Sequence, residues 1–165
     1  MKIVKTHTGK IYVDTDRQLE FLTVGDYGKE NNIKADFLGL HKEINGVANT
    51  EVDLSKKWVA TISTQKGCPM RCKFCDCWQY GYHGNVTRNE MSYQISTILE
   101  NESDITHTER FNVHFARMGE PTWNDDVIYF ALQDLKGLVN SYIKADTIHP
   151  VVSTMLPNGN NELEW

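Results

Sequence analysis

The sequence predicts an α/β fold in which parallel strands alternate with helices. From residue 58 onward, β-branched runs typical of strands alternate with segments whose apolar residues recur at helical spacing. Each predicted strand in this part of the chain also leads into residues suited to binding or chemistry. The carboxyl ends of parallel strands meet at one edge of a sheet, and ligand sites of α/β sheets lie there.

The first 57 residues are predicted to form a small β-rich segment that precedes the α/β core. Short strands are expected over residues 10–13 and 19–24, because both stretches are rich in β-branched and aromatic residues. Turn-forming residues follow at 25–28, and a short apolar stretch covers 36–40. The sequence therefore divides into a lead-in, residues 1–57, and a core, residues 58–165.

The core begins with a predicted strand over 58–64 and a predicted helix over about 88–100. Thr87 and Glu90 have the spacing of a capping box at the start of that helix. A second strand is expected over 111–116. Asn124 is a plausible N-cap for a second helix. A third strand is expected over 150–155, so the three strands are predicted to end at Thr64, Arg117 and Thr154.

Composition limits the class of protein. The chain has 165 residues, 40% hydrophobic and 24% charged, which is ordinary for one soluble domain. No apolar run approaches the ~20 residues of a membrane span, so no membrane partner is expected. The formal net charge of −5 gives no global basic footprint for nucleic acid, although a local patch would still be compatible with it. Four cysteines within ten residues favour metal binding in a reducing cytoplasm over disulfides.

Three of these cysteines, Cys68, Cys72 and Cys75, stand at C-x3-C-x2-C spacing. Iron–sulfur clusters usually take four cysteine thiolates, so a loop with three would leave one iron open for chemistry. Phe74 places an aromatic ring beside the third cysteine. The alternative is a zinc-binding module, in which Cys77 would be the fourth ligand. Outside a zinc site, Cys77 is interpreted as a structural or incidental thiol.

Two further motifs follow the second and third strands. Gly119-Glu120-Pro121 offers a close backbone approach and a carboxylate, although a simple Gly-Pro turn has the same pattern. Ser153 and its neighbour Thr154 offer hydroxyls, which often bond only to local backbone groups.

Cations surround the cysteines: Lys66, Arg71 and Lys73. They could offset the negative charge of a thiolate cluster, contact an RNA phosphate, or remain solvated.

The C-x3-C-x-aromatic-C loop resembles that of the radical S-adenosylmethionine (SAM) superfamily. The resemblance implies a 4Fe–4S cluster held by Cys68, Cys72 and Cys75, whose fourth iron chelates the amino and carboxylate groups of SAM. An electron from an external flavodoxin- or ferredoxin-like donor would then cleave SAM to methionine and a 5′-deoxyadenosyl radical. It further implies that Phe74 lies by the adenine, that Gly119 and Glu120 bind the SAM amino group, and that Ser153 lies near the ribose or carboxylate.

The similarity is greatest to the branch of radical SAM RNA adenine methyltransferases. It runs through residues 63–68, 84–90, 118–121 and 152–154, in that order, and covers roughly residues 58–157. It implies RNA or a nucleotide as substrate. Those enzymes use two additional cysteines, one seven residues before the cluster and one near the C-terminus. Here the first position is Thr61, and no cysteine follows Cys77, so the two-cysteine mechanism cannot run on this sequence. The resemblance then implies an oxidoreductase or a methyltransferase with different chemistry, such as hydrogen abstraction by the deoxyadenosyl radical.

Radical SAM cores resemble a six-unit partial (β/α) barrel. The stretch from residue 57 to residue 165 has room for about three units of ~30 residues. The sequence therefore predicts an incomplete partial barrel of about three βα units with parallel strands, and possible complementation by a C-terminal half. An inactive fragment that keeps the motif is the remaining alternative.

Overall fold

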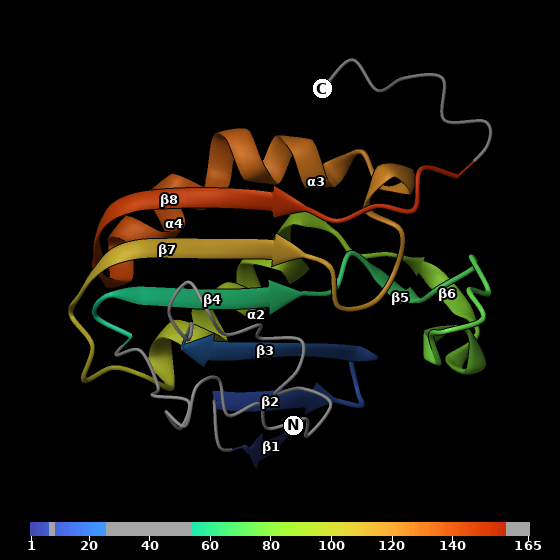
Figure 1. The fold of residues 1–165 in the computed structure, drawn as a ribbon, viewed down its shortest axis with the longest axis horizontal. Coiled ribbons are helices and arrows are strands. Elements are labelled where there is room, and N and C mark those ends of the chain that lie inside the picture. The colour runs from blue at the N-terminus through green and yellow to red at the C-terminus, as the bar shows by residue number, and fades with distance from the viewer. Residues whose placement is uncertain (7–8, 26–53, 158–165) are drawn as a thin grey trace, which may run out of the picture.

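The computed structural model describes residues 1–6, 9–25 and 54–157. Six strands of these residues form one open sheet in the order β1-β2-β3-β4-β7-β8 (Figure 1). Their bounds are β1 (Lys2–Lys5), β2 (Gly9–Asp14), β3 (Leu19–Gly25), β4 (Lys57–Ile62), β7 (His107–Phe115) and β8 (Lys144–Val152). A second, two-stranded sheet consists of β5 (Gln65–Gly67) and β6 (Tyr82–Asn85).

The large sheet is mixed. Strands β4, β7 and β8 run parallel, as the sequence predicts, with Trp58 opposite Phe111 and Phe111 opposite Ile148. Strands β1, β2 and β3 are antiparallel, and β3 also pairs antiparallel with β4. The predicted boundary at residue 57 therefore falls at the start of a strand that is paired with the lead-in. The α/β class is confirmed, whereas a barrel of three βα units is not.

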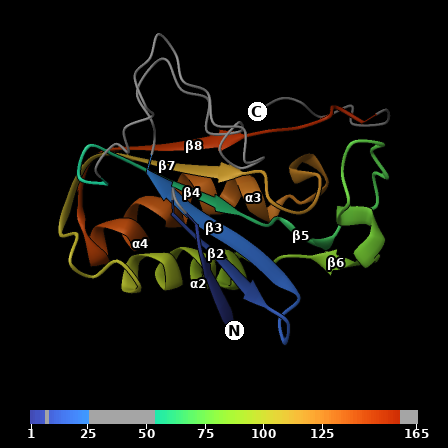
Figure 2. The same cartoon turned by 60° about the horizontal axis from the view of Figure 1, so that its bottom comes forward.

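Helices cover one face of the sheet (Figure 2). The helical elements are η1 (Cys77–Tyr80), which lies between β5 and β6, α2 (Arg88–Glu100), η2 (Pro121–Trp123), α3 (Asp126–Tyr129), η3 (Phe130–Asp134) and α4 (Leu135–Tyr142). The α2 helix begins with the predicted capping box between Thr87 and Glu90. The second predicted helix is interrupted, because η3 is a π-helical turn between α3 and α4. Asn124 stands just before it and its Oδ1 accepts from the amide of Asp126 at 3.2 Å.

The main core lies between these helices and the sheet. Alternate residues of β4 and β7 face α2, so that Trp58 and Phe111 pack edge to face at 5.4 Å between ring centroids. From α2, Met91, Ile95 and Ile98 are fully buried. Burial of each such side chain contributes roughly 1.5–3 kcal/mol, which fixes the helix against the parallel strands.

Several elements differ from the prediction. Strand β1 and the β5–β6 hairpin were not predicted, and the apolar stretch 36–40 lies outside the described residues. The third strand begins at Lys144, not at Pro150. Proline is tolerated within β8 because this strand is at the edge of the described sheet, where its missing N–H breaks no ladder. The three parallel strands end at Ile62, Phe115 and Val152, two residues before the predicted ends. In the part of the chain that is described, no helix has the length and apolar character needed to cross a membrane.

Candidate functional site

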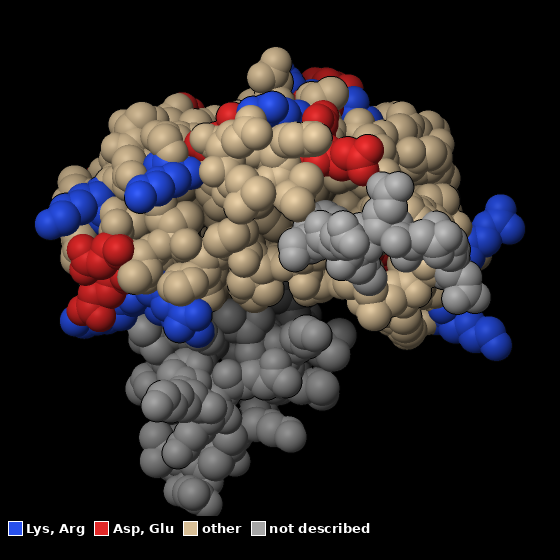
Figure 3. Space-filling view, turned by 90° about the horizontal axis from the view of Figure 1, so that it is seen from above, with Lys and Arg blue, Asp and Glu red and all other residues tan. Residues whose placement is uncertain are grey.

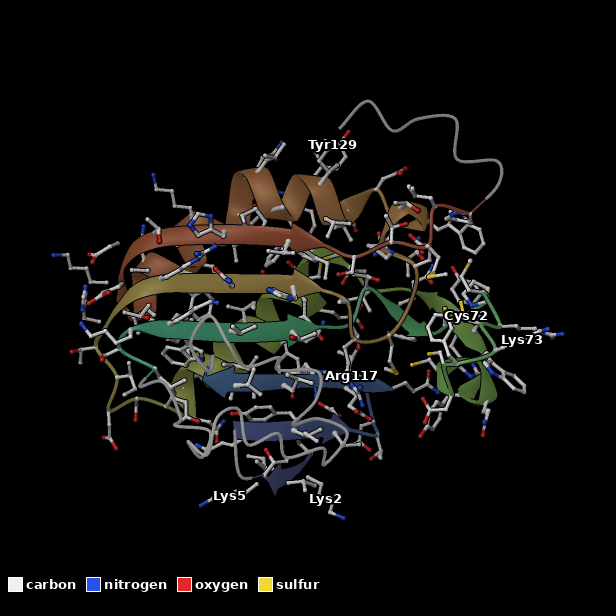
Figure 4. The ribbon with its side chains drawn as sticks, in the orientation of Figure 1. Lys2, Lys5, Cys72, Lys73, Arg117 and Tyr129 are labelled. Atoms are coloured by element: carbon white, nitrogen blue, oxygen red, sulfur yellow. The ribbon has the colours of Figure 1, made fainter. Side chains whose placement is uncertain are left out.

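The cysteine loop is the segment between β5 and β6, and it lies at the carboxyl ends of the parallel strands (Figures 1 and 4). Its base is tight: Cys68 N donates to Gly81 O at 3.1 Å. Gly67 has φ of 73°, and a Cβ there would collide with the carbonyl oxygen of Gly81. Glycine is therefore required at the entrance to the loop.

The three predicted ligands, Cys68, Cys72 and Cys75, are half-buried free thiols. Burial is the main cause that raises the pKa of the Cys68 thiol, and the amide of Met70 opposes it. The charges of Cys75, Cys72 and Glu120 raise that pKa further, in decreasing order. Cys68 is thus close enough to the other two ligands and to Glu120 to interact with each electrostatically. A bound cation or cationic cluster would relieve this repulsion between thiolates, so the donor set fits an iron–sulfur cluster.

Cys77 differs from the other three cysteines. It is buried, and its Sγ lies 3.7 Å from Arg117 O, to which it donates. Burial, followed by a hydrogen bond with Cys75, raises the pKa of the Cys77 thiol to about 12. Ligand atoms of Cys75, Asp76 and Cys77 lie within 4.8 Å of one another, close enough for a single metal ion. These three residues could therefore contribute ligands to a single metal ion.

Gly119 and Glu120 follow β7 and are held against the start of β5. Gly119 has φ of 100°, and a Cβ there would lie 2.5 Å from Cβ of Gln65. The Gln65 side chain joins two segments: its Oε1 accepts from Glu120 N at 2.9 Å, and its Nε2 donates to Asn85 Oδ1 at 2.9 Å. The backbone of Gln65 adds a hydrogen bond to Met118 O at 3.1 Å. The Gly-Glu segment is therefore fixed by hydrogen bonds to the cysteine hairpin and is not an isolated turn.

The Glu120 carboxylate is buried, with 2% of the residue exposed. Its Oε1 accepts from Thr122 N at 3.2 Å, from Thr122 Oγ1 at 2.7 Å and from Thr154 Oγ1, and its Oε2 accepts from Met155 N at 3.0 Å. Burial acts to raise the pKa of Glu120, but the hydrogen bonds from Thr154, Met155 and Thr122 outweigh it and hold that pKa below its usual value. The carboxylate is thus kept ionised, and its Oε2 retains capacity for another donor.

Phe74 and Ser153 both face solvent in the structure. Phe74 is 79% exposed, and Ser153 is exposed just after the end of β8. Of the two hydroxyls at the end of β8, that of Thr154 donates a hydrogen bond to Glu120. Among the described residues, Ser153 forms no hydrogen bond with a residue of the site. The positions of Phe74 and Ser153 relative to SAM stay predictions.

Sequence reasoning missed Gln65 and assigned Asn124 only a capping role. Asn124 is 3% exposed, and its Nδ2 donates to Thr64 O at 2.7 Å and to Val86 O at 2.8 Å. It therefore joins the segment after β7 to both ends of the cysteine hairpin. A polar residue directly after a buried strand, such as Gln65, was the available signal. Arg117, at the end of β7, forms an ion pair with Glu20 of β3 (Figure 4), which links the antiparallel strands to the same edge.

Comparison with known proteins adds a sequence relationship. No family model matches the chain. Curated proteins named probable dual-specificity RNA methyltransferase RlmN do match. The protein from Trichormus variabilis is 34% identical over 90 residues, which is 54% of this chain and 24% of the relative. The protein from Chlorobaculum tepidum is 34% identical over 96 residues, 58% of this chain and 25% of the relative.

A solved structure titled as a radical SAM methyltransferase from Sphaerobacter thermophilus covers 93% of this chain and 38% of its own, with a TM-score of 0.59 and 21% identity. Over about half of its length, the chain is similar in sequence to these RNA methyltransferases. It spans about a quarter of the length of the curated relatives given above. Because the structural neighbour is only 21% identical, the match shows a shared fold alone. The resemblance stated from the cysteine loop is thereby confirmed.

Proposed function

We propose that this protein binds a 4Fe–4S cluster and SAM and starts radical chemistry on RNA or a nucleotide. Cys68, Cys72 and Cys75 would hold the cluster. The observation that carries the proposal is the convergence of three parallel strands on one edge. Strand β4 leads into the cysteine loop, β7 into Gly119 and Glu120, and β8 into Thr154, which bonds to Glu120.

The residues of this edge have separate tasks. When bound, the cluster supplies the electron that cleaves SAM. Gly119 keeps the backbone close to Gln65, so the carboxylate of Glu120 is held on the cysteine side of the sheet edge. Glu120 would accept a hydrogen bond from the amino group of SAM, because an ionised carboxylate is suited to an ammonium. By resemblance, Phe74 would lie by the adenine and Ser153 near the ribose or carboxylate.

Thr61 supports hydrogen abstraction over two-cysteine methylation. It lies in β4 at the position where the resembled methyltransferases have a cysteine. Threonine has a hydroxyl in place of the thiol and therefore cannot supply a thiolate. The substrate would lose a hydrogen atom to the deoxyadenosyl radical without a methyl carrier from this segment.

The remaining partners follow from the same proposal. An external donor of the flavodoxin or ferredoxin kind would supply the electron, and the relatives named as RNA methyltransferases support RNA as substrate. A complementing C-terminal half is the other partner that the resemblance implies. Closely spaced free cysteines support a reducing, cytoplasmic location.

Anaerobic reconstitution tests the proposal. With iron, sulfide and reductant, the protein is expected to gain about four irons, turn brown, and release methionine and 5′-deoxyadenosine from SAM. A colourless protein with one zinc held by the four cysteines would instead establish the binding module. Cluster assembly without SAM cleavage would identify a fragment that is inactive.

A further inference from the structure

Exposed aromatic side chains gather around the cysteine hairpin. We define the aromatic rim as Trp78, Tyr80, Tyr82 and Trp123, with 43%, 63%, 48% and 38% of each residue exposed. Three of them lie within the last part of the hairpin, and exposed apolar side chains mark an interaction site when they occur together, whereas single ones are common on any surface. The cluster ligand assignments do not involve any of the four.

The rim is held in place by hydrogen bonds. Tyr82 Oη donates to Asn85 Oδ1 at 3.1 Å, and Asn85 Nδ2 donates to Trp123 O at 2.8 Å. Gly81 N donates to Trp78 O at 3.1 Å, and His83 Nε2 lies 2.8 Å from Tyr80 O. One asparagine therefore joins the hairpin to the segment after β7, so the rings are presented on an ordered backbone and little order is lost on binding.

The hairpin is also locally basic in an acidic chain. The formal net charge of the chain is −5, yet Lys66, Arg71 and Lys73 are accompanied between residues 65 and 85 by a single carboxylate, Asp76. Lys66 is paired with Glu90 at 2.7 Å, whereas Arg71 and Lys73 are exposed. Lys73 points away from the end of the hairpin (Figure 4), and Lys and Arg side chains project from that end of the molecule in Figure 3.

Rings and cations together fit one class of partner. Single strands of nucleic acid bind to aromatic rings on which their bases stack, beside cations that contact their phosphates. Bases in a duplex are already stacked and cannot reach such rings. Tyr80 also lines a cavity of about 240 Å³ that the hairpin forms with Leu19, Glu20 and Met118, so a base on Tyr80 has a concave surface beside it.

We infer that the aromatic rim, with Arg71 and Lys73, binds unpaired bases of single-stranded RNA and brings them to the cysteine edge of the sheet. This inference rests on the proposed function for its choice of RNA, but it assigns the contacts to residues that the proposal does not use. An acidic electron-donor protein would also be attracted by the cations, yet it would not require four exposed rings.

The test is binding of a fluorescein-labelled single-stranded RNA of about ten nucleotides, measured by anisotropy with the full-length reconstituted protein. Tyr80→Leu is expected to raise the Kd by about 5- to 150-fold, since one base-on-ring contact is lost. Tyr80→Phe keeps the ring and is expected to stay within about twofold of the parent. The matched control is Tyr129→Leu, because Tyr129 is 50% exposed on α3 and lies away from the hairpin (Figure 4).

Salt dependence tests the cations. Lys73→Ala is expected to reduce the slope of log K against log salt by about 0.7, the value for one phosphate contact of a single strand. Lys5→Ala, at the opposite side of the molecule in Figure 4, is expected to leave the slope unchanged. A duplex of the same sequence is expected to bind more weakly than the single strand.

Three results would overturn the inference. The first is no binding of the single strand, and the second is an equal loss of RNA affinity in Tyr80→Leu and Tyr129→Leu. The third is that Tyr80→Leu weakens the binding of reduced flavodoxin and leaves the binding of RNA unchanged. SAM cleavage is assayed in the same preparation. SAM cleavage without RNA binding would reject the role of the aromatic rim and leave the proposed SAM chemistry standing. RNA binding that depends on the rim, without SAM cleavage, would support the rim and reject the proposed SAM chemistry.

Discussion

Replacement of Thr154 by valine tests how the end of β8 is attached to Glu120. Valine keeps the shape of threonine and removes the hydroxyl that donates to Glu120 Oε1. The carboxylate is 2% exposed, so water cannot replace the lost donor without entering the site. Hydrogen bonds to charged groups contribute about 1.5–3 kcal/mol, and we expect the free energy of unfolding at pH 7 to fall by about 2 kcal/mol.

The effect has a defined pH dependence. In the folded protein the pKa of Glu120 is held below its usual value of 4.5. The stability that its ionised form contributes is therefore fully present above about pH 4.5 and is lost as the pH falls through the folded pKa. In Thr154→Val the folded pKa of Glu120 moves up towards the usual value. The gap between parent and variant is thus constant near neutral pH and narrows below pH 4.5.

The assay is urea unfolding followed by circular dichroism at pH 7 and at pH values below 4.5. Thermal unfolding at pH 7 is expected to show a Tm lower by about 4–8 °C for a chain of this size. Ser153→Ala is the matched control, since Ser153 is the exposed neighbour, and its effect is expected within about 0.5 kcal/mol. Thr154→Ser retains the hydroxyl and should retain most of the stability. Equal losses in Ser153→Ala and Thr154→Val, or a gap that does not change with pH, would refute the reasoning.

Three other changes probe the same edge. Gly119→Ala is expected to destabilise the protein by about 2 kcal/mol or more in urea unfolding, because a positive φ and the approach of Gln65 both oppose a Cβ; a neutral result would contradict the geometry. Asn124→Leu removes the side-chain donor to Val86 O and one of the two donors to Thr64 O, which keeps the amide of Val86. It is expected to cost about 1–3 kcal/mol, whereas a loss well below 1 kcal/mol would show that the hairpin does not depend on it. Cys77→Ser is expected to keep the iron content of the reconstituted protein at about four per chain, while Cys75→Ser loses the cluster absorbance; the opposite order would reverse the ligand assignment.

The elements that the sequence predicted are those with strong local signals. Thr87 and Glu90 specify the start of α2 by themselves, and β-branched runs specify β4 and β7, because each signal lies within a few residues. The same logic placed the cysteines and Glu120 at one edge, since parallel strands have their carboxyl ends together. The prediction missed the first part of β8, before residue 150. This strand is exposed at the edge of the described sheet and lacks the apolar alternation that marks a strand.

What the sequence did not reveal depends on contacts between distant segments. The antiparallel pairing of β3 with β4 joins residues separated by more than thirty positions, and no local pattern encodes it. The choice of Thr154 over Ser153 as the partner of Glu120 depends on which way each side chain leaves the end of β8. A strand alternates its faces, so adjacent hydroxyls cannot both face the carboxylate, but periodicity alone does not say which one does.

Gln65 sets a restriction on how this protein could change. Its amide oxygen receives the backbone N–H of Glu120 while its amide nitrogen reaches Asn85, so one side chain needs a donor and an acceptor at a fixed length. Glutamate would offer two acceptors, and asparagine is shorter by a methylene. Loss of either contact would loosen the carboxylate relative to the thiols, while Asn124 and the backbone hydrogen bonds to Met118 O would still connect the two segments.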